Sequence, residues 1–450
     1  MPVYERRSLL PVSTTELYAW HARDGALERL LPPWQEAILE HSEGGLADRR
    51  LVMKMRLAGP IWRRWVARHD GHEPGRWFRD VQDEGPFARW VHTHRFEPEG
   101  AGAVLVDSVA YDLPLGGLGA FVGGSFVAAE LDRMFRFRHQ RTREDLERHR
   151  GGNKMRVAIS GASGLIGRQL GAFLTTGGHE VLRLVRREAG PGEVRWDPAR
   201  GTVDAAALEG VDAVVHLAGE SVAGGRWTAA RKKEILESRR AGTDALARAL
   251  AGLDRKPKVF VSASAVGIYG DTKDREVDEA SDPGSGFLAD VCKAWEAAAD
   301  PARAAGIRVV HPRIGVVLSA AGGALAELRT PFSFGVGGPV GSGEQWFPWI
   351  SMDDTIGALH HLLTAQAEGP VNLVAPAPVR QRELASTLGR VLKRPAVMPL
   401  PAFAVRTLFG EMGSEVLLAG QRVKPRRLGE LGFSWLRTDL EAALRMELGR

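Results

Sequence analysis

The sequence predicts a doubly wound parallel α/β sheet after residue 155, preceded by a smaller α+β domain. Three observations support this fold class. Segment 155–167 is an apolar run that breaks into glycines and then opens a helix, as a dinucleotide-binding strand, turn and helix do. Apolar runs then alternate with helical stretches, which is typical of a parallel sheet. Before residue 150, strand-like runs follow one another with polar turns between them, which indicates an antiparallel sheet.

Composition narrows the class of protein. A chain of 450 residues with 44% hydrophobic content is long enough for two or three domains, each with a core. The net charge of +5 is modest and basic residues are scattered among acids, which argues against nucleic acid as a partner. Cys292 is the single cysteine, which excludes an intrachain disulfide and fits a reducing compartment. No signal-like segment or long uncharged run is present, so we expect a cytoplasmic protein without a membrane span.

Residues 1–150 are expected to form the first domain, with the boundary at the polar joint 148–154. Val3 to Pro11 reads as a strand, and Ser13 or Thr14 is placed to cap a following helix. A helical pattern from Leu118 to His149 closes the domain. Between the two helices we expect further strands at 36–41, 46–57, 62–69, 76–82, 87–96 and 103–113.

One expected strand of this domain carries an aromatic and histidine face. Trp90, His92, His94 and Phe96 alternate, so their side chains should point to the same side of the strand. We expect the histidines on a half-solvated face, or lining a cavity if the long helix covers it. Two histidines at this spacing could begin a metal site, but the sequence shows no clustered third ligand. No metal site is therefore predicted.

From Met155 onward, the pattern is that of a parallel sheet covered by helices on both faces. Helical stretches are expected at 227–250 and 288–305. The expected strands are 156–160, 180–185, 213–217, 258–262, 308–313 and 371–374.

The glycines after the first of these strands suit a pyrophosphate at a helix N-terminus. Gly161 would make the tight turn, Gly164 would let phosphates approach the backbone, and Gly167 would let the helix pack closely on the strand.

About 20 residues later, where an acid would hold a free ribose 2′-hydroxyl, the sequence has Arg186 and Arg187. A guanidinium matches a 2′-phosphate, so the pattern favours NADP(H) over NAD(H). The alternative is two solvated arginines at a strand end.

Seven segments in order resemble the extended short-chain dehydrogenase/reductases, and more closely an atypical epimerase-like branch often labelled nucleoside-diphosphate-sugar epimerase. They are GASGLIG (161–167), HLAGE (216–220), SRRAGT (238–243), SASAVGIYG (262–270), FLADVCKAWE (287–296), PRIGVVL (312–318) and WISMDD (349–354). The resemblance implies an NADP(H)-binding Rossmann domain at 155–375 and a C-terminal lobe at 376–450. The layout of residues 1–150 resembles the helix-grip lipid-transfer and polyketide-cyclase-like superfamily, which implies an apolar ligand.

The same resemblance implies the site residues. Ser264 would hydrogen-bond the reacting oxygen, and Lys293 would hold the nicotinamide ribose. The family's catalytic tyrosine would stand four residues before that lysine, where this sequence has Ala289. The expected cofactor contacts are Gly161, Ser163, Gly164, Leu165, Ile166, Gly167, Arg186, Arg187, Leu217, Ala218, Gly219, Ser262, Lys293, Pro312 and Arg313.

Ala289 cannot transfer a proton, and three interpretations follow. Another acid could serve, with Tyr269 the best candidate and Glu220 and Cys292 behind it; a packed ring with a satisfied hydroxyl explains Tyr269 equally well. Alternatively, solvent could protonate the product after reduction of an activated double bond. Finally, the domain could bind NADP(H) without turnover and act as a redox-sensing module.

Several polar and aromatic residues are candidates for a small-molecule substrate. The glycine-rich segment 332–348, with Gln345 and Trp346, would suit a loop that closes over substrate, although an ordinary connector explains it as well. Arg239 would favour an anionic substrate. The remaining predicted substrate contacts are Glu220, Arg226, Trp227 and Trp349. The sequence leaves the substrate and the oligomeric state open.

Overall fold

The computed structural model describes residues 2–114 and 116–450, except for the side chains of 57, 58 and 116–122. The described chain divides into two compact units. The N-terminal unit is formed mainly by residues up to Asn153, and the C-terminal unit mainly by Lys154 to Met446. None of the described helices has both the length and the apolar character needed to cross a bilayer.

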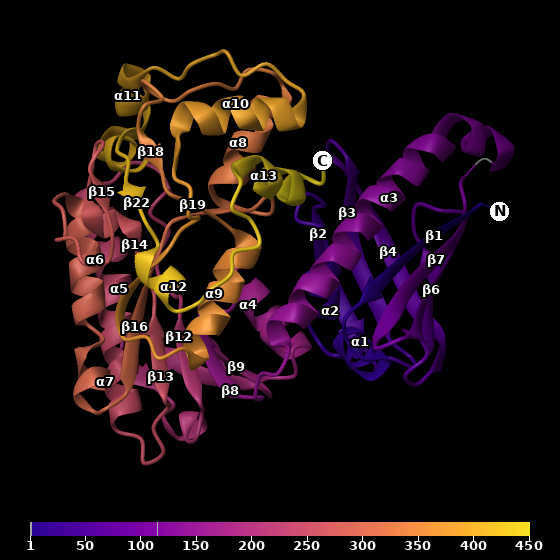
Figure 1. Ribbon diagram of the computed structural model, residues 1–450, viewed down its shortest axis with the longest axis horizontal. Helices are drawn as coiled ribbons and strands as arrows, with labels where there is room; N and C mark the ends of the chain where they lie inside the picture. The colour runs from indigo at the N-terminus through magenta and orange to yellow at the C-terminus, as the bar shows by residue number, and fades with distance from the viewer. Residues whose placement is uncertain (1, 115) are drawn as a thin grey trace. The chain divides into compact units, whose positions relative to one another are not determined.

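The N-terminal unit is an antiparallel sheet in the order β1-β7-β6-β5-β4-β3-β2, with the long helix α3 lying across one face (Figure 1). Every strand predicted for this part of the sequence is confirmed. The Ser13 hydroxyl accepts a hydrogen bond from the Glu16 amide and caps α1, as predicted. The elements are β1 (Val3–Leu10), α1 (Thr14–Ala22), α2 (Ala26–Leu30), β2 (Ala37–Glu43), β3 (Arg50–Ala58), β4 (Ile61–Glu73), β5 (Trp77–Glu84), β6 (Arg89–Glu99), β7 (Gly102–Asp112) and α3 (Gly116–His149).

The four alternating residues of β6 all face the interior of this unit. His92 and His94 are 3% and 7% exposed, and the ring of Phe135 from α3 lies 5.2 Å from that of His92. The expectation of a half-solvated face was therefore wrong, because α3 covers this side of the sheet. The sequence pattern predicts which side chains of β6 share a face of the sheet, but not which helix covers that face.

The C-terminal unit is a parallel sheet in the order β10-β9-β8-β12-β13-β16, extended by β20 beside β16. Each of the six predicted strands is confirmed, while β10 was not predicted. Helices pack on both faces, with α4 and α9 on one core and α5 and α7 on the other. The sheet elements are β8 (Arg156–Ser160), β9 (Glu180–Val185), β10 (Glu193–Asp197), β11 (Thr202–Val203), β12 (Ala213–His216), β13 (Val259–Ser262), β14 (Ser264–Ala265), β16 (Arg308–Ile314) and β20 (Gly369–Leu373).

The helices of this unit differ from the prediction at one place. The stretch expected as a single helix from 288 to 305 divides into α6 and α7. The principal helices are α4 (Leu165–Thr176), α5 (Ala229–Ala251), α6 (Phe287–Ala297), α7 (Asp300–Ala304), α8 (Gly323–Ser333) and α9 (Met352–Thr364). Short strand pairs complete it: β15 (Glu276–Val277) with β22 (Arg422–Val423), β17 (Val316–Leu318) with β19 (Trp349–Ser351), and β18 (Trp346–Phe347) with β21 (Val379–Arg380).

The chain after β21 packs back onto the sheet. Asp354, fully buried in α9, accepts backbone hydrogen bonds from Leu436 (2.7 Å) and Arg437 (2.9 Å). The indole of Trp435 donates to the carbonyl of Val374 at 3.1 Å. The buried carboxylate and these backbone amides therefore satisfy each other's hydrogen-bonding capacity. Its helices are α10 (Gln381–Leu392), α11 (Ala402–Met412), α12 (Arg426–Glu430) and α13 (Leu440–Leu448).

Candidate dinucleotide site

Two glycines of the turn from β8 into α4, Gly161 and Gly167, have no room for a side chain. Gly161 has a left-handed φ of 70°, and a Cβ there would lie 2.8 Å from the backbone of Leu217 and Ala218. A Cβ on Gly167 would lie 2.2 Å from the carbonyl oxygen of Gly161. Gly164 is exposed, and a Cβ there would approach only the carbonyl oxygen of Gly161, at 3.2 Å. The turn is therefore a bare backbone surface at the start of a helix, which fits a pyrophosphate.

The two arginines after β9 have different partners. The guanidinium of Arg187 makes a two-pronged pair with Glu193, at 2.7 and 2.5 Å. Arg186 is exposed at the carboxyl end of β9, in the position of the ribose-recognising residue. A 2′-phosphate would have to compete with Glu193 for Arg187. Arg186 is accordingly the better placed of the two.

The predicted contacts at the ends of β12 and β13 lie at the carboxyl edge of the sheet. Leu217 and Ala218 are half-buried, and Gly219 is exposed. Ser262 is fully buried, and its hydroxyl has no hydrogen-bond partner in the described part of the chain. His216 accepts or donates at 2.5 Å to Ser160, and burial lowers the pKa of its imidazole to about 4. His216 is therefore neutral at physiological pH.

Ser264 and Tyr269 belong to one chain of hydrogen bonds. The Ser264 hydroxyl donates to Glu296 at 2.7 Å, and Arg313 holds both oxygens of that carboxylate at 2.8 and 3.0 Å. Arg313 also donates to the Tyr269 hydroxyl at 2.9 Å. That hydroxyl in turn donates to the side-chain oxygen of Asn372 at 2.8 Å. The network fixes both predicted catalytic side chains in one orientation.

Tyr269 has the features of a packed ring with a satisfied hydroxyl. It is 1% exposed, and burial raises the pKa of its phenol although Arg313 opposes that change. Transfer of its proton would require the bond to Asn372 to break. Of the two interpretations left open for Tyr269, the geometry favours the structural one.

The other candidates around α6 are also constrained. Ala289 is 1% exposed, so the position of the family tyrosine is filled by the core. The Lys293 ammonium is half-exposed and lies 2.6 Å from Asp290. Burial raises the pKa of the Cys292 thiol to about 11, which makes it a poor proton donor or nucleophile near neutral pH. Glu220 is exposed and lies 3.4 Å from Arg231.

The predicted substrate contacts do not all face a free surface. Trp349 is 1% exposed and donates its indole N–H to the carbonyl of Ala377 at 3.2 Å, so its ring fills the core instead of forming a substrate loop. Trp227 is 9% exposed and packs edge to face on Phe287. Arg226 is exposed and donates to backbone carbonyls of α11.

The glycine-rich segment before Trp349 is held at several points. Gln345 donates to the carbonyls of Val340 and Leu417, at 3.0 and 2.9 Å. The indole of Trp346 lies between the guanidinium groups of Arg380 and Arg422, at 4.3 and 4.9 Å. These contacts describe an anchored connector, which was the alternative to a closing loop.

The structure brings two further residues close to predicted site residues. Arg239 is half-buried beside Gly219, and its guanidinium lies 4.9 Å from the ring of Trp295. Glu296 was not singled out from the sequence, although it partners Ser264. It follows Ala289 and Cys292 at the i, i+3, i+7 spacing of one helix face, which was the available signal.

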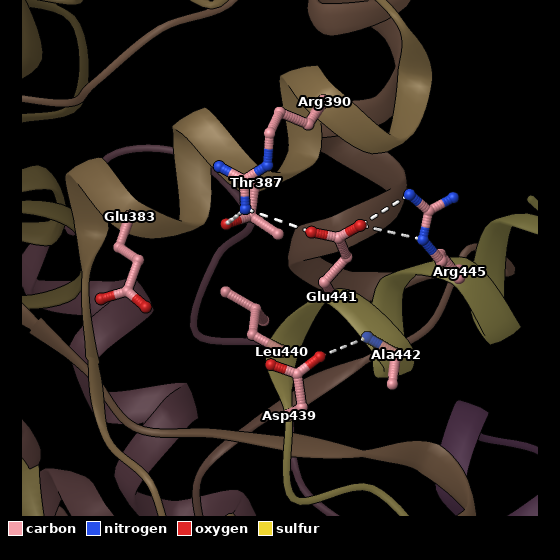
Figure 2. A pocket seen from close by; sticks show the side chains of 8 residues that line it. All are labelled: Glu383, Thr387, Arg390, Asp439, Leu440, Glu441, Ala442 and Arg445. Carbon is pink, nitrogen blue, oxygen red and sulfur yellow. Dashed lines mark hydrogen bonds and ion pairs between the residues drawn. The ribbon is translucent and has the colours of Figure 1, made fainter.

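A polar hollow of about 310 Å³ lies between α10 and the start of α13 (Figure 2). Glu441 pairs there with Arg390 at 3.2 Å and with Arg445 at 2.6 Å. The Asp439 carboxylate accepts from the Ala442 amide at 2.9 Å. These groups satisfy one another, and none of them is a predicted cofactor contact.

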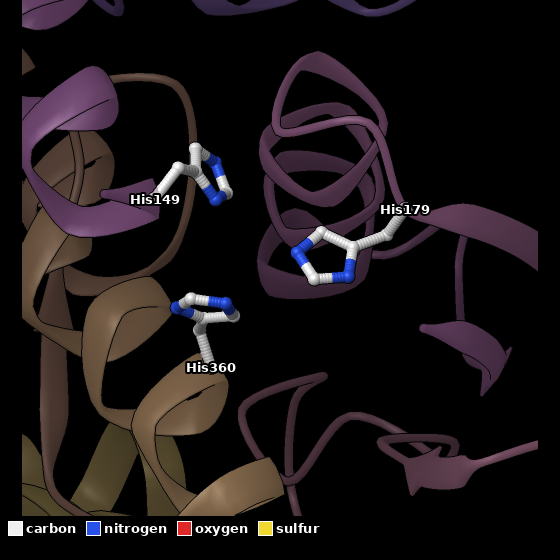
Figure 3. A group of neighbouring side chains, drawn as sticks. All are labelled: His149, His179 and His360. Carbon is white, nitrogen blue, oxygen red and sulfur yellow. The ribbon is translucent and has the colours of Figure 1, made fainter. Parts of the chain in front are cut away.

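At the amino end of β8, opposite the dinucleotide turn, two histidines of the same unit are in contact. The rings of His179 and His360 meet edge to face at 5.4 Å (Figure 3). His179 Nδ1 accepts from the Met155 amide at 3.2 Å, and the His360 ring also packs on Phe173. These contacts support the start of β8 and the inner face of α4. His149, drawn in the same view, belongs to the N-terminal unit.

Taken together, a doubly wound sheet and a bare glycine turn define a nicotinamide-dinucleotide-binding protein of the Rossmann type. Residues 157–374 match the NAD dependent epimerase/dehydratase family, and residues 400–446 match a domain of unknown function, DUF1731. An epimerase family protein of Mycobacterium bovis is 46% identical over 290 residues, which are 64% of this chain and 96% of that protein. The human epimerase family protein SDR39U1 is 40% identical over 297 residues, 65% of this chain and 99% of that protein. The chain belongs to this epimerase family.

Two solved structures are similar to it. A nucleoside-diphosphate sugar epimerase from Corynebacterium glutamicum has a TM-score of 0.82 at 36% identity, covering 99% of this chain and 90% of that one. Human SDR39U1 with NADPH has a TM-score of 0.60 at 38% identity, covering 65% of this chain and 99% of that one. The first of these likenesses extends over both units, the second over about two thirds of the chain.

Proposed function

We propose that the chain is an NADP(H)-dependent, epimerase-like oxidoreductase acting on a small molecule. The observation that carries the proposal is the bare turn at Gly161 to Gly167 with the exposed Arg186 at the next strand end. The human relative solved with NADPH supports the phosphate-bearing cofactor. Bound NADP(H) would supply hydride exchange with the substrate carbon.

The residues of this chain would bind and orient the reacting groups. Lys293 would leave Asp290 to hold the nicotinamide ribose. The Ser264 hydroxyl donates to Glu296, so its oxygen keeps the capacity to accept a hydrogen bond. Ser264 is 2% exposed, so a substrate hydroxyl would reach this oxygen only after the side chains that cover it move. Donation to a substrate carbonyl requires the same hydroxyl to turn away from Glu296. The buried position of Tyr269 favours protonation by solvent over protonation by its phenol.

A second function fits two of the same observations. Ala289 is buried where the family tyrosine would stand, and the Tyr269 hydroxyl is fully hydrogen-bonded. A protein without a proton carrier could bind NADP(H) and report its redox state. In that case the N-terminal unit, whose antiparallel sheet and long helix fit a helix-grip domain, would hold an apolar ligand.

Turnover with NADPH separates the two functions. The protein is incubated with NADPH and a panel of carbonyl and enone compounds, and absorbance of the reduced nicotinamide is followed. An oxidoreductase oxidises NADPH with at least one compound, and Ser264→Ala lowers that rate while Ser386→Ala, on the exposed face of α10, does not. Tight NADPH binding without oxidation by any compound would support the sensor.

A fluorescent fatty-acid probe tests the N-terminal unit separately. The full chain should bind the probe in proportion to protein concentration, and a competing fatty acid should displace it. No binding by a folded chain would remove the apolar ligand from the proposal, while leaving NADP(H) binding untouched.

A further inference from the structure

A second polar cluster lies inside the N-terminal unit, on β5, β6 and β7. Asp80 stands directly opposite His92 in the β5–β6 ladder, and His94 opposite Asp107 in the β6–β7 ladder. The two histidines and Asp107 are buried, while the Asp80 side chain keeps 18% of its surface exposed. Asp80 is the third candidate ligand beside the two histidines. The sequence did not reveal it, because it lies on a neighbouring strand.

The nitrogens that face Asp80 have the separation of metal ligands. Asp80 Oδ1 lies 3.2 Å from His92 Nδ1 and 3.7 Å from His94 Nε2, and the three ligand atoms are all within 4.8 Å of one another. Ligands at about 2.0–2.1 Å from a tetrahedral ion are about 3.3–3.4 Å apart. The three atoms therefore surround a point at which one ion could bind without movement of the backbone.

Asp107 holds the opposite edges of the same imidazoles. Its Oδ1 lies 2.9 Å from His92 Nε2 and 2.6 Å from His94 Nδ1, although the second contact lacks hydrogen-bond alignment. Its Oδ2 lies 2.7 Å from His139 Nε2. A carboxylate accepts the N–H of the ring nitrogen that faces it, so the opposite nitrogen is unprotonated and free to bind a metal. For His92 the nitrogen facing Asp107 is Nε2, and Nδ1 faces Asp80.

The two carboxylates of the cluster have histidines as their charge partners. In the described part of the chain, the ion pairs of Asp80 and Asp107 are all with histidines, and none is with lysine or arginine. Arg138 is close enough for its charge to interact with both carboxylates, but its Nε donates to the carbonyl of Leu30 at 3.2 Å. The negative charge of the buried Asp107 and the partly exposed Asp80 is balanced either by protons on the histidines beside them or by one divalent ion.

We propose that Asp80 Oδ1, His92 Nδ1 and His94 Nε2 bind one divalent transition-metal ion inside the N-terminal unit, with Asp107 hydrogen-bonded to His92 and in contact with His94. Two imidazoles and a carboxylate suit zinc and ferrous iron alike. The partial exposure of Asp80 marks the route of entry. A three-ligand set leaves a coordination position for water or for an oxygen of a bound molecule.

Equilibrium dialysis of the full chain against Zn²⁺, Fe²⁺ and Co²⁺ tests the site, with metal content measured by mass spectrometry. We expect one equivalent per chain and visible ligand-field absorption from the cobalt form. His94→Phe keeps the ring that stacks on Phe78 but removes the nitrogens, and Asp80→Ala removes the carboxylate. Each should lower uptake at least tenfold. Asp107→Asn should weaken binding by about 10–100-fold.

His21→Phe is the matched control, because His21 is a buried histidine of the same core whose Nδ1 contacts the carbonyl of Leu17. It should bind metal like the unsubstituted chain. Circular dichroism and thermal unfolding of each metal-free variant show whether it folds. Metal uptake far below one equivalent by the folded chain overturns the proposal. Protons on the histidines would then balance the charge of Asp80 and Asp107. The proposal is also overturned if folded His94→Phe and folded Asp80→Ala each take up as much metal as the unsubstituted chain, because the metal then binds elsewhere.

Discussion

Two adjacent arginines illustrate how one neighbour changes the role of a side chain. Arg187 already pairs with Glu193, whereas Arg186 is exposed at the end of β9. Arg186→Asp should weaken NADPH binding about 10–100-fold and leave NADH binding nearly unchanged, because a charge-assisted bond to phosphate is worth about 1.5–3 kcal/mol. Arg183→Asp, at an exposed position of the same strand, is the control. Titration followed by nicotinamide fluorescence checks it, and equal losses for both cofactors would refute the phosphate contact.

The hydroxyl of Tyr269 can be removed without removing the ring. Tyr269→Phe leaves Arg313 and the side-chain oxygen of Asn372 each short of one hydrogen bond, so we expect a loss of about 1–3 kcal/mol in the free energy of unfolding. NADPH affinity should not change, because the hydroxyl faces the core. Urea denaturation measures the first quantity. Lost turnover with unchanged stability would instead identify Tyr269 as a proton carrier.

Single residues were also where the sequence was least informative. Asp80 and Glu296 complete their clusters only through pairing with a neighbouring strand or helix face, which residue order does not show. Trp349 follows a glycine-rich segment and was expected at a substrate loop, but its indole reaches a core carbonyl. Burial depends on what packs against a side chain, and that partner is distant in sequence.

At the scale of elements, the tightest contact of the dinucleotide site is between α4 and the turn before it. Gly167→Ala would place a Cβ 2.2 Å from the Gly161 carbonyl, so α4 must shift. We expect at least a tenfold loss of NADPH affinity and a lower unfolding temperature. Calorimetric titration and thermal unfolding compare Gly167→Ala with the unsubstituted chain.

Elements with continuous apolar runs were predictable, and those with mixed patterns were not. Strands β8 and β9 were predicted to the residue, because both are apolar runs bounded by turn signals. Strand β10 was missed because three of its five residues are charged and only Val194 and Trp196 are buried. The division between α6 and α7 follows no glycine, and Pro301 marks only the start of the second helix.

At the scale of the whole molecule, a neutral histidine at the centre of the sheet makes stability depend on pH. The folded pKa of His216 is about 4, below its ordinary 6.5, so between these values the unfolded chain binds more protons. Stability should therefore fall as pH drops from 6.5 to 4, by up to about 3 kcal/mol from this group, with no contribution above 6.5. Urea denaturation across this range measures the slope. Burial lowers the pKa of His21 to about 3, so that histidine adds to the same slope. His216→Gln should therefore reduce the slope without abolishing it, and an unchanged slope would contradict the contribution of His216.

The contact between Asp354 and the amides of Leu436 and Arg437 makes the last fifteen residues indispensable to a helix eighty positions upstream. A chain that ends after residue 430 would leave the buried carboxylate of Asp354 without these two amide partners. Such a loss commonly lowers the free energy of unfolding by several kcal/mol. Premature termination should thus yield an insoluble product even though every predicted cofactor contact is still encoded.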